Sequence, residues 1–247
     1  MPTPDSPPDS IAQIKQLTKR YRRLVALSEV SFSIRRGEVL GVIGPNGSGK
    51  TTLFECLGGV LPFDAGAIVR PDRPLGYRDL ALTFFYLPDA IAPWPAQSVD
   101  WVLDFTLGFF GGPAPMRDEV VRRLDLEPLL GSAIGSLSKG QRKRTLLALA
   151  LLTPHPVMLA DEPFDGLDLR QSRDVAQALR SFAARKRTIV LSIHQVSDAA
   201  RVCDRFVLLS GGRVCGEGTL DELTTLAHAR DQSTAHGDLE EVFLALT

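Results

Sequence analysis

The chain has 247 residues, of which 44% are hydrophobic and 23% are charged. These fractions are typical of soluble globular proteins, and they exclude a fully disordered or collagen-like chain. The charges of the 28 basic and 29 acidic residues nearly cancel. The chain therefore lacks the excess positive charge typical of nucleic-acid-binding proteins, and we expect no nucleic-acid partner.

The first ten residues contain four prolines and two aspartates but no apolar segment. This composition predicts a short disordered tail over residues 1–10, not a signal peptide. No apolar run approaches the roughly 20 residues that span a bilayer, and residues 146–152 form the longest candidate. We therefore expect any membrane role to depend on a partner. Three widely spaced cysteines, without metal-binding spacing, are predicted to be free thiols.

Strand and helix patterns alternate along most of the chain. Apolar residues alternate with serines over residues 30–34, which predicts a half-buried strand. Continuous apolar runs indicate strands covered on both faces, and a helical pattern covers residues 173–185. The alternation predicts an α/β fold with a parallel sheet. The predicted buried strands are residues 39–43, 157–160, 188–192 and 206–209.

The middle of the chain has a different pattern. Residues 99–110 and 117–124 have helical spacing, and Gly111, Gly112 and Pro113 separate them. We expect residues 90–153 to form a helical lobe inserted into the α/β core. The core would then comprise residues 11–89 and 154–225, followed by a helical tail over residues 226–247.

A glycine-rich segment after the strand at residues 39–43 matches the phosphate-binding pattern GxxxxGK[ST]. Its backbone N–H groups and the start of the helix predicted over residues 50–57 would face phosphate oxygens. Lys50 would neutralise the β- and γ-phosphates, and the Thr51 hydroxyl would ligate Mg²⁺. A structural glycine turn is the alternative. The predicted nucleotide-binding residues here are Gly44, Pro45, Asn46, Gly47, Ser48, Gly49, Lys50, Thr51 and Thr52.

A second acidic pair follows the strand predicted at residues 157–160. Asp161 is placed to hold Mg²⁺, usually through water. Glu162 is placed to polarise an attacking water as a general base. Many strands end in acidic residues that are merely solvated, so the interpretation of this pair as a metal and catalytic site depends on the presence of the phosphate-binding loop.

The segment Leu137–Ser138–Lys139–Gly140–Gln141 precedes three basic residues and an apolar helix. With the other motifs in the same order, the sequence resembles the ATP-binding subunit of an ATP-binding cassette (ABC) transporter, whose signature is LSxGQ. In that family, Ser138, Gly140 and Gln141 would belong to the signature surface that faces the γ-phosphate of the opposite subunit. Lys139 replaces the usual first glycine. A serine N-cap on an ordinary helix is the alternative.

The resemblance covers about residues 11–225 and assigns further roles. Tyr21 would stack on adenine, residues 165–168 would contact the partner subunit, and His194 would hydrogen-bond the γ-phosphate and hold the attacking water. The implied fold is a P-loop NTPase with a RecA-like parallel sheet core, an antiparallel β subdomain and an inserted α-helical subdomain. Residues 239–244 resemble the tail of bacterial exporter-type ATPases.

One position departs from the family pattern. After the strand that ends near Leu87, the family usually has a glutamine, whereas this chain has Asp89. A charged carboxylate favours a hard cation, so one hypothesis places Asp89 at the metal, with altered hydrolysis or coupling. The other hypothesis turns Asp89 to solvent and leaves the loop to dock a membrane partner, with Trp94 as a possible anchor.

The resemblance implies an ATPase that binds ATP and Mg²⁺ at a two-protomer interface. Its expected partners are a transmembrane permease subunit and a second ATPase protomer, identical or related. It would lie at the cytoplasmic face of the cell membrane, and overall likeness favours export over import. The main alternative is a soluble ABC-type ATPase not coupled to transport. A P-loop kinase or GTPase would lack the LSKGQ segment.

Overall fold

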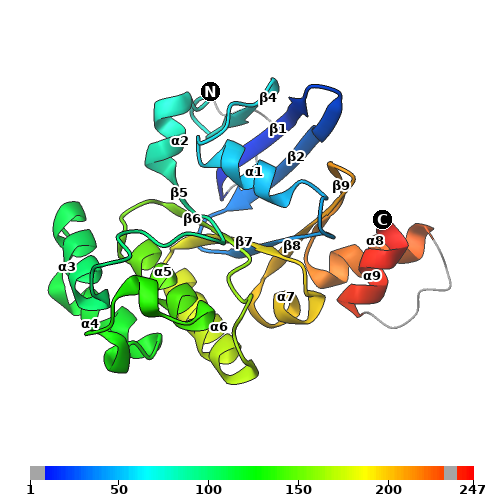
Figure 1. The fold of residues 1–247 in the computed structure, drawn as a ribbon. Coiled ribbons are helices and arrows are strands. Elements are labelled where there is room, and N and C mark those ends of the chain that lie inside the picture. Colours follow the sequence, from blue (N-terminus) through cyan, green and yellow to red (C-terminus); the bar gives the residue numbers. More distant parts are fainter. Residues whose placement is uncertain (1–8, 231–237) are drawn as a thin grey trace.

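The computed structural model describes residues 9–230 and 238–247. Its centre is a six-stranded sheet in the order β5-β6-β7-β3-β8-β9 (Figure 1). Neighbouring strands are parallel except β9, which pairs antiparallel with β8. This confirms the predicted parallel sheet. The strands are β3 (Val39–Ile43), β5 (Phe84–Leu87), β6 (Val157–Asp161), β7 (Thr188–Ile193), β8 (Arg205–Ser210) and β9 (Arg213–Gly218).

Strand β3 shows why the central strands are continuously apolar. Side chains on a strand point alternately to opposite faces. Val39 and Ile43 belong to one hydrophobic core, whereas Leu40 and Val42 belong to the other. Both faces are therefore covered, as the apolar run predicted.

Helices cover one face of this sheet, and α1 lies on the other, beneath a smaller sheet (Figure 1). The helix predicted over residues 50–57 is confirmed as α1. The helices outside the middle lobe are α1 (Lys50–Leu57), α2 (Tyr77–Thr83), α6 (Leu169–Ala183), α7 (Val196–Val202), α8 (Leu220–Arg230) and α9 (Leu239–Leu246).

The smaller sheet is antiparallel, in the order β2-β1-β4. It consists of β1 (Ser10–Tyr21), β2 (Leu24–Arg35) and β4 (Ala65–Val69). Its apolar side chains pack with Leu53 and Phe54 of α1 and with one face of the central sheet. The expected antiparallel subdomain is therefore present.

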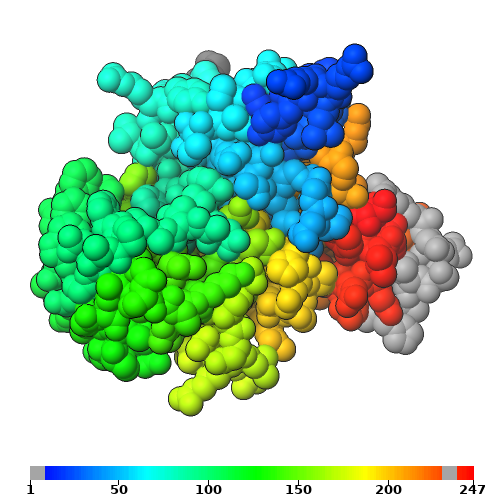
Figure 2. All heavy atoms as spheres, in the orientation of Figure 1, coloured from blue at the N-terminus to red at the C-terminus, as the bar shows by residue number. Residues whose placement is uncertain are grey.

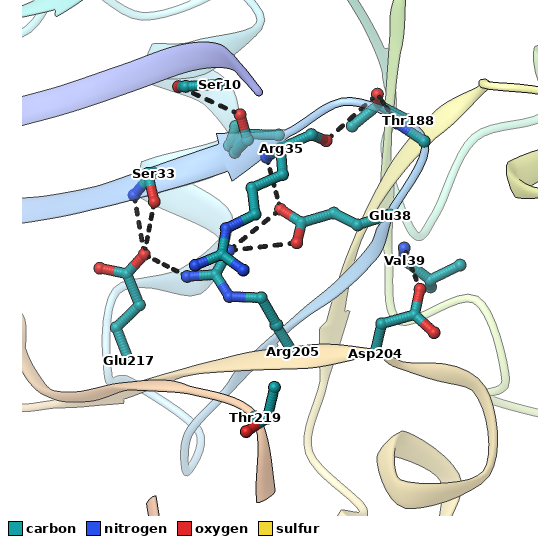
Figure 3. A network of polar contacts seen from close by, with 12 residues as sticks. Ser10, Ser33, Arg35, Glu38, Val39, Thr188, Asp204, Arg205, Glu217 and Thr219 are labelled. Carbon is teal, nitrogen blue, oxygen red and sulfur yellow. Dashed lines mark hydrogen bonds and ion pairs between the residues drawn. The ribbon is translucent and has the colours of Figure 1, made fainter. Parts of the chain in front are cut away.

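A buried arginine connects the two sheets (Figure 3). Arg205 of β8 pairs with Glu38 at 3.1 Å and with Glu217 of β9 at 2.6 Å. Glu217 in turn accepts hydrogen bonds from the backbone N–H and the hydroxyl of Ser33 in β2. Burial raises the pKa of the Glu38 carboxyl, and Arg205 partly opposes that rise. The Arg205 guanidinium, which has several donors, thus joins the carboxylates of Glu38 and Glu217, two residues far apart in the sequence.

The middle of the chain forms a helical lobe at one end of the molecule, drawn in green in Figure 2. It contains α3 (Val99–Phe110), α4 (Ala114–Arg123), α5 (Lys139–Leu152) and two short 3₁₀ turns. An isolated bridge between Ser98 and Ala133 is its one β-type pairing among the described residues. The helix predicted at residues 99–110 is confirmed, and the one predicted at 117–124 begins earlier, at Ala114.

Two predicted boundaries need correction. The sequence places Ser10 in the N-terminal tail, but Ser10 begins β1, where its hydroxyl donates to the carbonyls of Ala12 and Ile34. Residues 1–8 of that tail lie outside the described residues. The boundary expected after residue 225 falls inside α8, whose Leu223 and Ala227 are buried in the same hydrophobic cluster as Val242 of α9. None of the helices in the described ranges has the length and apolarity to cross a bilayer.

Candidate functional site

The glycine-rich loop joins the end of β3 to the start of α1. Two glycines are required by close approach: a Cβ at Gly44 would lie 2.2 Å from the Leu209 carbonyl oxygen, and Gly49 has φ +107° with a Cβ site 2.7 Å from the Ala26 carbonyl oxygen. The Lys50 ammonium donates to the carbonyls of Gly44 at 2.7 Å and Pro45 at 3.2 Å. The loop therefore folds around its own lysine.

A hollow of about 600 Å³ opens beside this loop. Its lining includes sequence-predicted residues from separate parts of the chain: the loop, Tyr21, Asp89, Asp161 and Glu162. Tyr21 lies at the end of β1 and is 42% exposed, so its ring is accessible for stacking. Gly211 and Gly212, between β8 and β9, complete the opposite rim.

Asp161, the last residue of β6, is the centre of a hydrogen-bond cluster. Its Oδ2 accepts from the Thr51 hydroxyl at 2.9 Å and from the Tyr86 hydroxyl at 3.4 Å. Its Oδ1 accepts from the Ser192 hydroxyl. Burial and the negative charge of Asp161 raise the pKa of the Tyr86 phenol, so Tyr86 remains a neutral donor. The cluster holds the Asp161 carboxylate beside the phosphate-binding helix.

Glu162 has a backbone conformation that is rare for a side-chain-bearing residue, with φ +47°. Its N–H donates to the Ser192 hydroxyl at 3.0 Å. Its carboxylate lies 2.5 Å from His194 Nδ1 and 3.7 Å from Lys50 Nζ. The turn thus directs the carboxylate between the two residues to which the sequence assigned phosphate contacts. Such strained conformations concentrate at functional sites.

The signature residues lie elsewhere in the chain. Ser138 is the exposed N-cap of α5, where its hydroxyl accepts from the Gln141 N–H and Gln141 Oε1 accepts from the Ser138 N–H. The N-cap reading is therefore correct as local structure. Gly140 packs against the loop at Gly166. None of these three residues lines the hollow around Lys50.

Lys139, the unusual residue of the signature, contacts the loop after Glu162. Its ammonium lies 2.5 Å from Asp165 Oδ2. This hydrogen bond lowers the pKa of the Asp165 carboxyl and raises that of Lys139. Gly166 beside it has φ +81° and packs on the Lys139 side chain. The lysine therefore joins the start of α5 to residues 165–168.

Asp89 combines features of both hypotheses for this position. It lines the hollow together with Lys50 and Thr51, and its side chain is 37% exposed. Its Oδ1 also lies 2.5 Å from the ammonium of Lys143 in α5. The carboxylate is thus near the expected metal region, while one of its oxygens already has a cationic partner.

The hollow fits a magnesium nucleotide. The Ser48 hydroxyl of the loop is buried without a hydrogen-bond partner in the described part of the chain, although Ser48 does not itself line the hollow. Over the same residues, no cluster of three or more His, Cys, Asp or Glu side chains could hold a metal alone. Thr51 and Asp161 supply two adjacent oxygen donors, so a hard cation there would need phosphate or water oxygens as well.

Three partners of the site were missed by sequence analysis: Ser192, Tyr86 and Lys143. Ser192 had the clearest signal, because it ends a strand that was predicted. Parallel pairing of β6 and β7 places Ser192 opposite Asp161, so a polar residue at that strand end was a candidate. Tyr86 and Lys143 meet their partners across 75 and 54 residues, and local patterns give no sign of such contacts.

Comparison with known proteins identifies relatives of the whole fold. Residues 27–165 match a family model described as ABC transporter. The chain is 32% identical over 230 residues to the "Hemin import ATP-binding protein HmuV" of Thermobifida fusca, covering 85% of this chain and 78% of that protein. It is 32% identical to the "Nod factor export ATP-binding protein I" of Ralstonia nicotianae, covering 92% and 73%.

A solved structure described as "Structure of ATP binding subunit of ABC transporter" has the same fold. Its TM-score against this chain is 0.83 at 28% identity, covering 96% of this chain and 99% of that one.

Proposed function

This chain belongs to the family of ABC transporter ATP-binding proteins, whose domains hydrolyse ATP, and from that premise we propose how its site works. The hollow around Lys50 binds Mg²⁺–ATP, and a second ATPase protomer completes it. The observation that carries this proposal is the gathering of Lys50, Thr51, Asp161 and Glu162 around one hollow, with His194 in contact with the Glu162 carboxylate from outside its lining. The signature serine lies outside that hollow.

Within one chain, each group has a distinct task. Tyr21 stacks on the adenine, and the loop amides with Lys50 hold the phosphates. Thr51 and Asp161 would hold Mg²⁺, and the charge of the ion would offset that of the terminal phosphates. Glu162 accepts a proton from the attacking water, and His194 keeps the Glu162 carboxylate oriented through their 2.5 Å contact. Catalysis of phosphoryl transfer depends mainly on such positioning and charge neutralisation.

The second protomer supplies the missing donors. Ser138 is exposed at the positive end of α5, a suitable surface for a phosphate. Its exposure at the helix start leaves it free to meet the nucleotide of another copy or of a related ATPase. A solved cassette that shares this fold is described as dimeric, which supports the same arrangement here.

We further propose that the assembly includes a transmembrane permease and works at the cytoplasmic face of the membrane as an exporter. Relatives named for Nod factor export and peptide export support that direction, although one relative is named for hemin import. A row of exposed aromatic side chains also supports a protein partner. It comprises Trp94, Trp101, Phe105 and Phe109 along α3 and the loop before it; Trp94 meets Trp101 edge-on, and the other three rings are stacked in series.

Replacing Glu162 tests the proposed chemistry. Glu162→Gln should keep ATP binding but lower turnover by about 10²–10⁴-fold, the usual contribution of a general base. The Glu162→Gln variant should also accumulate as a dimer when ATP is added. Light scattering would measure this dimer, first with Mg²⁺ present and then after Mg²⁺ is chelated. Turnover at the wild-type rate in this variant would remove Glu162 from that role. Recovery of a polytopic membrane protein with the tagged chain tests the permease.

A further inference from the structure

Lys143 is a buried lysine near the start of the signature helix. Its side chain is 3% exposed, and a buried ammonium needs an opposing charge because desolvation of an unpaired ion is costly. That charge is Asp89. The ammonium lies 2.5 Å from Asp89 Oδ1 and 3.4 Å from the Asp89 carbonyl oxygen. Lys143 therefore donates hydrogen bonds to both the side chain and the backbone of Asp89.

The pair connects two parts of the split site. Asp89 follows β5 by two residues and lines the nucleotide hollow. Lys143 lies four residues after Lys139, about 6 Å or one turn along α5, and Ser138 caps the same helix end. A wall of the hollow is thus bound to the element that presents the signature to another protomer.

The neighbouring basic residue has a different partner, which provides a comparison within the same helix. Arg144 is also buried, but its guanidinium donates to the carbonyls of Leu124 and Asp125, and to the Asp125 carboxylate at 3.2 Å. These groups belong to the turn after α4, and none of them lines the nucleotide hollow. Of these two buried cations, Lys143 alone contacts the hollow's wall.

We propose that Lys143 is a positioning residue, which holds Asp89 and thereby fixes the signature helix relative to the nucleotide hollow. This inference rests on the proposed two-protomer site. Asp89 then acts through Lys143 on the placement of Ser138, and not as a ligand of Mg²⁺. The acidic residue that departs from the family pattern is explained by its pairing with a lysine inside the protein.

Lys143→Met in the full chain is the first test. The affinity of this variant for ATP should stay within about twofold of wild type, because Lys143 makes no contact with the phosphate-binding loop. Turnover should fall at least about fivefold, the lower range of coupling between two sites, while the Mg²⁺ concentration for half-maximal turnover stays unchanged. Lys143→Arg keeps the charge and should retain most of the turnover.

Asp89→Asn and the double variant Asp89→Asn/Lys143→Met complete a mutant cycle. Each single variant should be slow, and the double variant should be no slower than either, because all three lack the same ion pair. Asp89→Asn should lose the most thermal stability, since it leaves a buried ammonium unpaired, and removing Lys143 as well should restore part of that loss.

Arg144→Met is the matched control. It removes a buried cation one residue along the helix, so it should lower thermal stability yet keep turnover near wild type at temperatures well below unfolding. If Arg144→Met slowed turnover as much as Lys143→Met, the effect would reflect general damage to α5 and overturn the inference.

Two other results would also overturn it: wild-type turnover in Lys143→Met, or multiplicative losses in the double variant. A raised Mg²⁺ requirement in Asp89→Asn without one in Lys143→Met would instead make Asp89 a metal ligand. Failure of the proposed function itself is separable, because it would appear as unchanged turnover in Glu162→Gln while the Lys143 variants were still measurable against wild type.

Discussion

The nucleotide side and the signature side of this protein are held in place by different means. Around Asp161, positions are set by the parallel strands β6 and β7, and of its hydrogen-bond partners Ser192 is buried, Tyr86 half-buried and Thr51 exposed. At the start of α5, Ser138 is exposed, and Lys139 and Lys143 connect the helix to loops through ion pairs. The first region is rigidly preorganised, whereas the second depends on side-chain links that can be removed singly.

The largest effect is expected at the rigid side. Asp161→Asn removes the negative charge of a carboxylate that accepts hydrogen bonds from the Thr51 and Ser192 hydroxyls. We propose that the same carboxylate holds Mg²⁺. We expect turnover to fall by about 10²–10³-fold, as when a preorganised electrostatic group is lost. The half-maximal Mg²⁺ concentration should rise, which a magnesium titration of turnover would show. An unchanged magnesium requirement would remove Asp161 from the metal site.

A smaller effect is expected from Ser192→Ala. The hydroxyl donates to Asp161 and accepts from the Glu162 N–H, so its loss leaves a buried carboxylate oxygen and an N–H without this partner. The free energy of unfolding should fall by about 1–3 kcal/mol, measured by urea denaturation. Turnover should fall as well, because Glu162 loses the bond that holds its strained backbone. A variant as stable and active as wild type would contradict the rigid description.

The smallest effect is expected at the exposed pair of the signature side. Lys139 lowers the pKa of Asp165, so the pair stabilises the fold above the ordinary aspartate pKa. That contribution is lost as the pH falls through the lowered pKa of the folded state. Both side chains are more than a third exposed, and solvent screens such pairs.

Asp165→Asn should therefore unfold almost as wild type does at neutral pH, and the difference between them should shrink further in acid. Thermal melts from neutral to acidic pH would measure this. A large loss of stability at neutral pH would show that the signature side is as rigidly built as the nucleotide side.

The same contrast explains how much was predictable from sequence. The phosphate-binding loop, Asp161 and Glu162 are contiguous with buried strands, so short patterns and strand ends predicted where they would gather. The Asp89–Lys143 pair and the Arg205 network join residues far apart in the chain. Nothing in a local pattern chooses one lysine or carboxylate among many, so these contacts required the folded structure.

The central claim, that each nucleotide is held by Lys50 of one protomer and Ser138 of another, can be tested by mixing two inactive variants. Lys50→Ala disables the loop, and Ser138→Arg blocks the signature. In a mixed dimer both defects fall on one site and the other site is intact, so turnover should reappear on mixing and increase with the mixed species counted by native mass spectrometry. Mixed dimers that form but hydrolyse no more ATP than the parent variants would contradict the account.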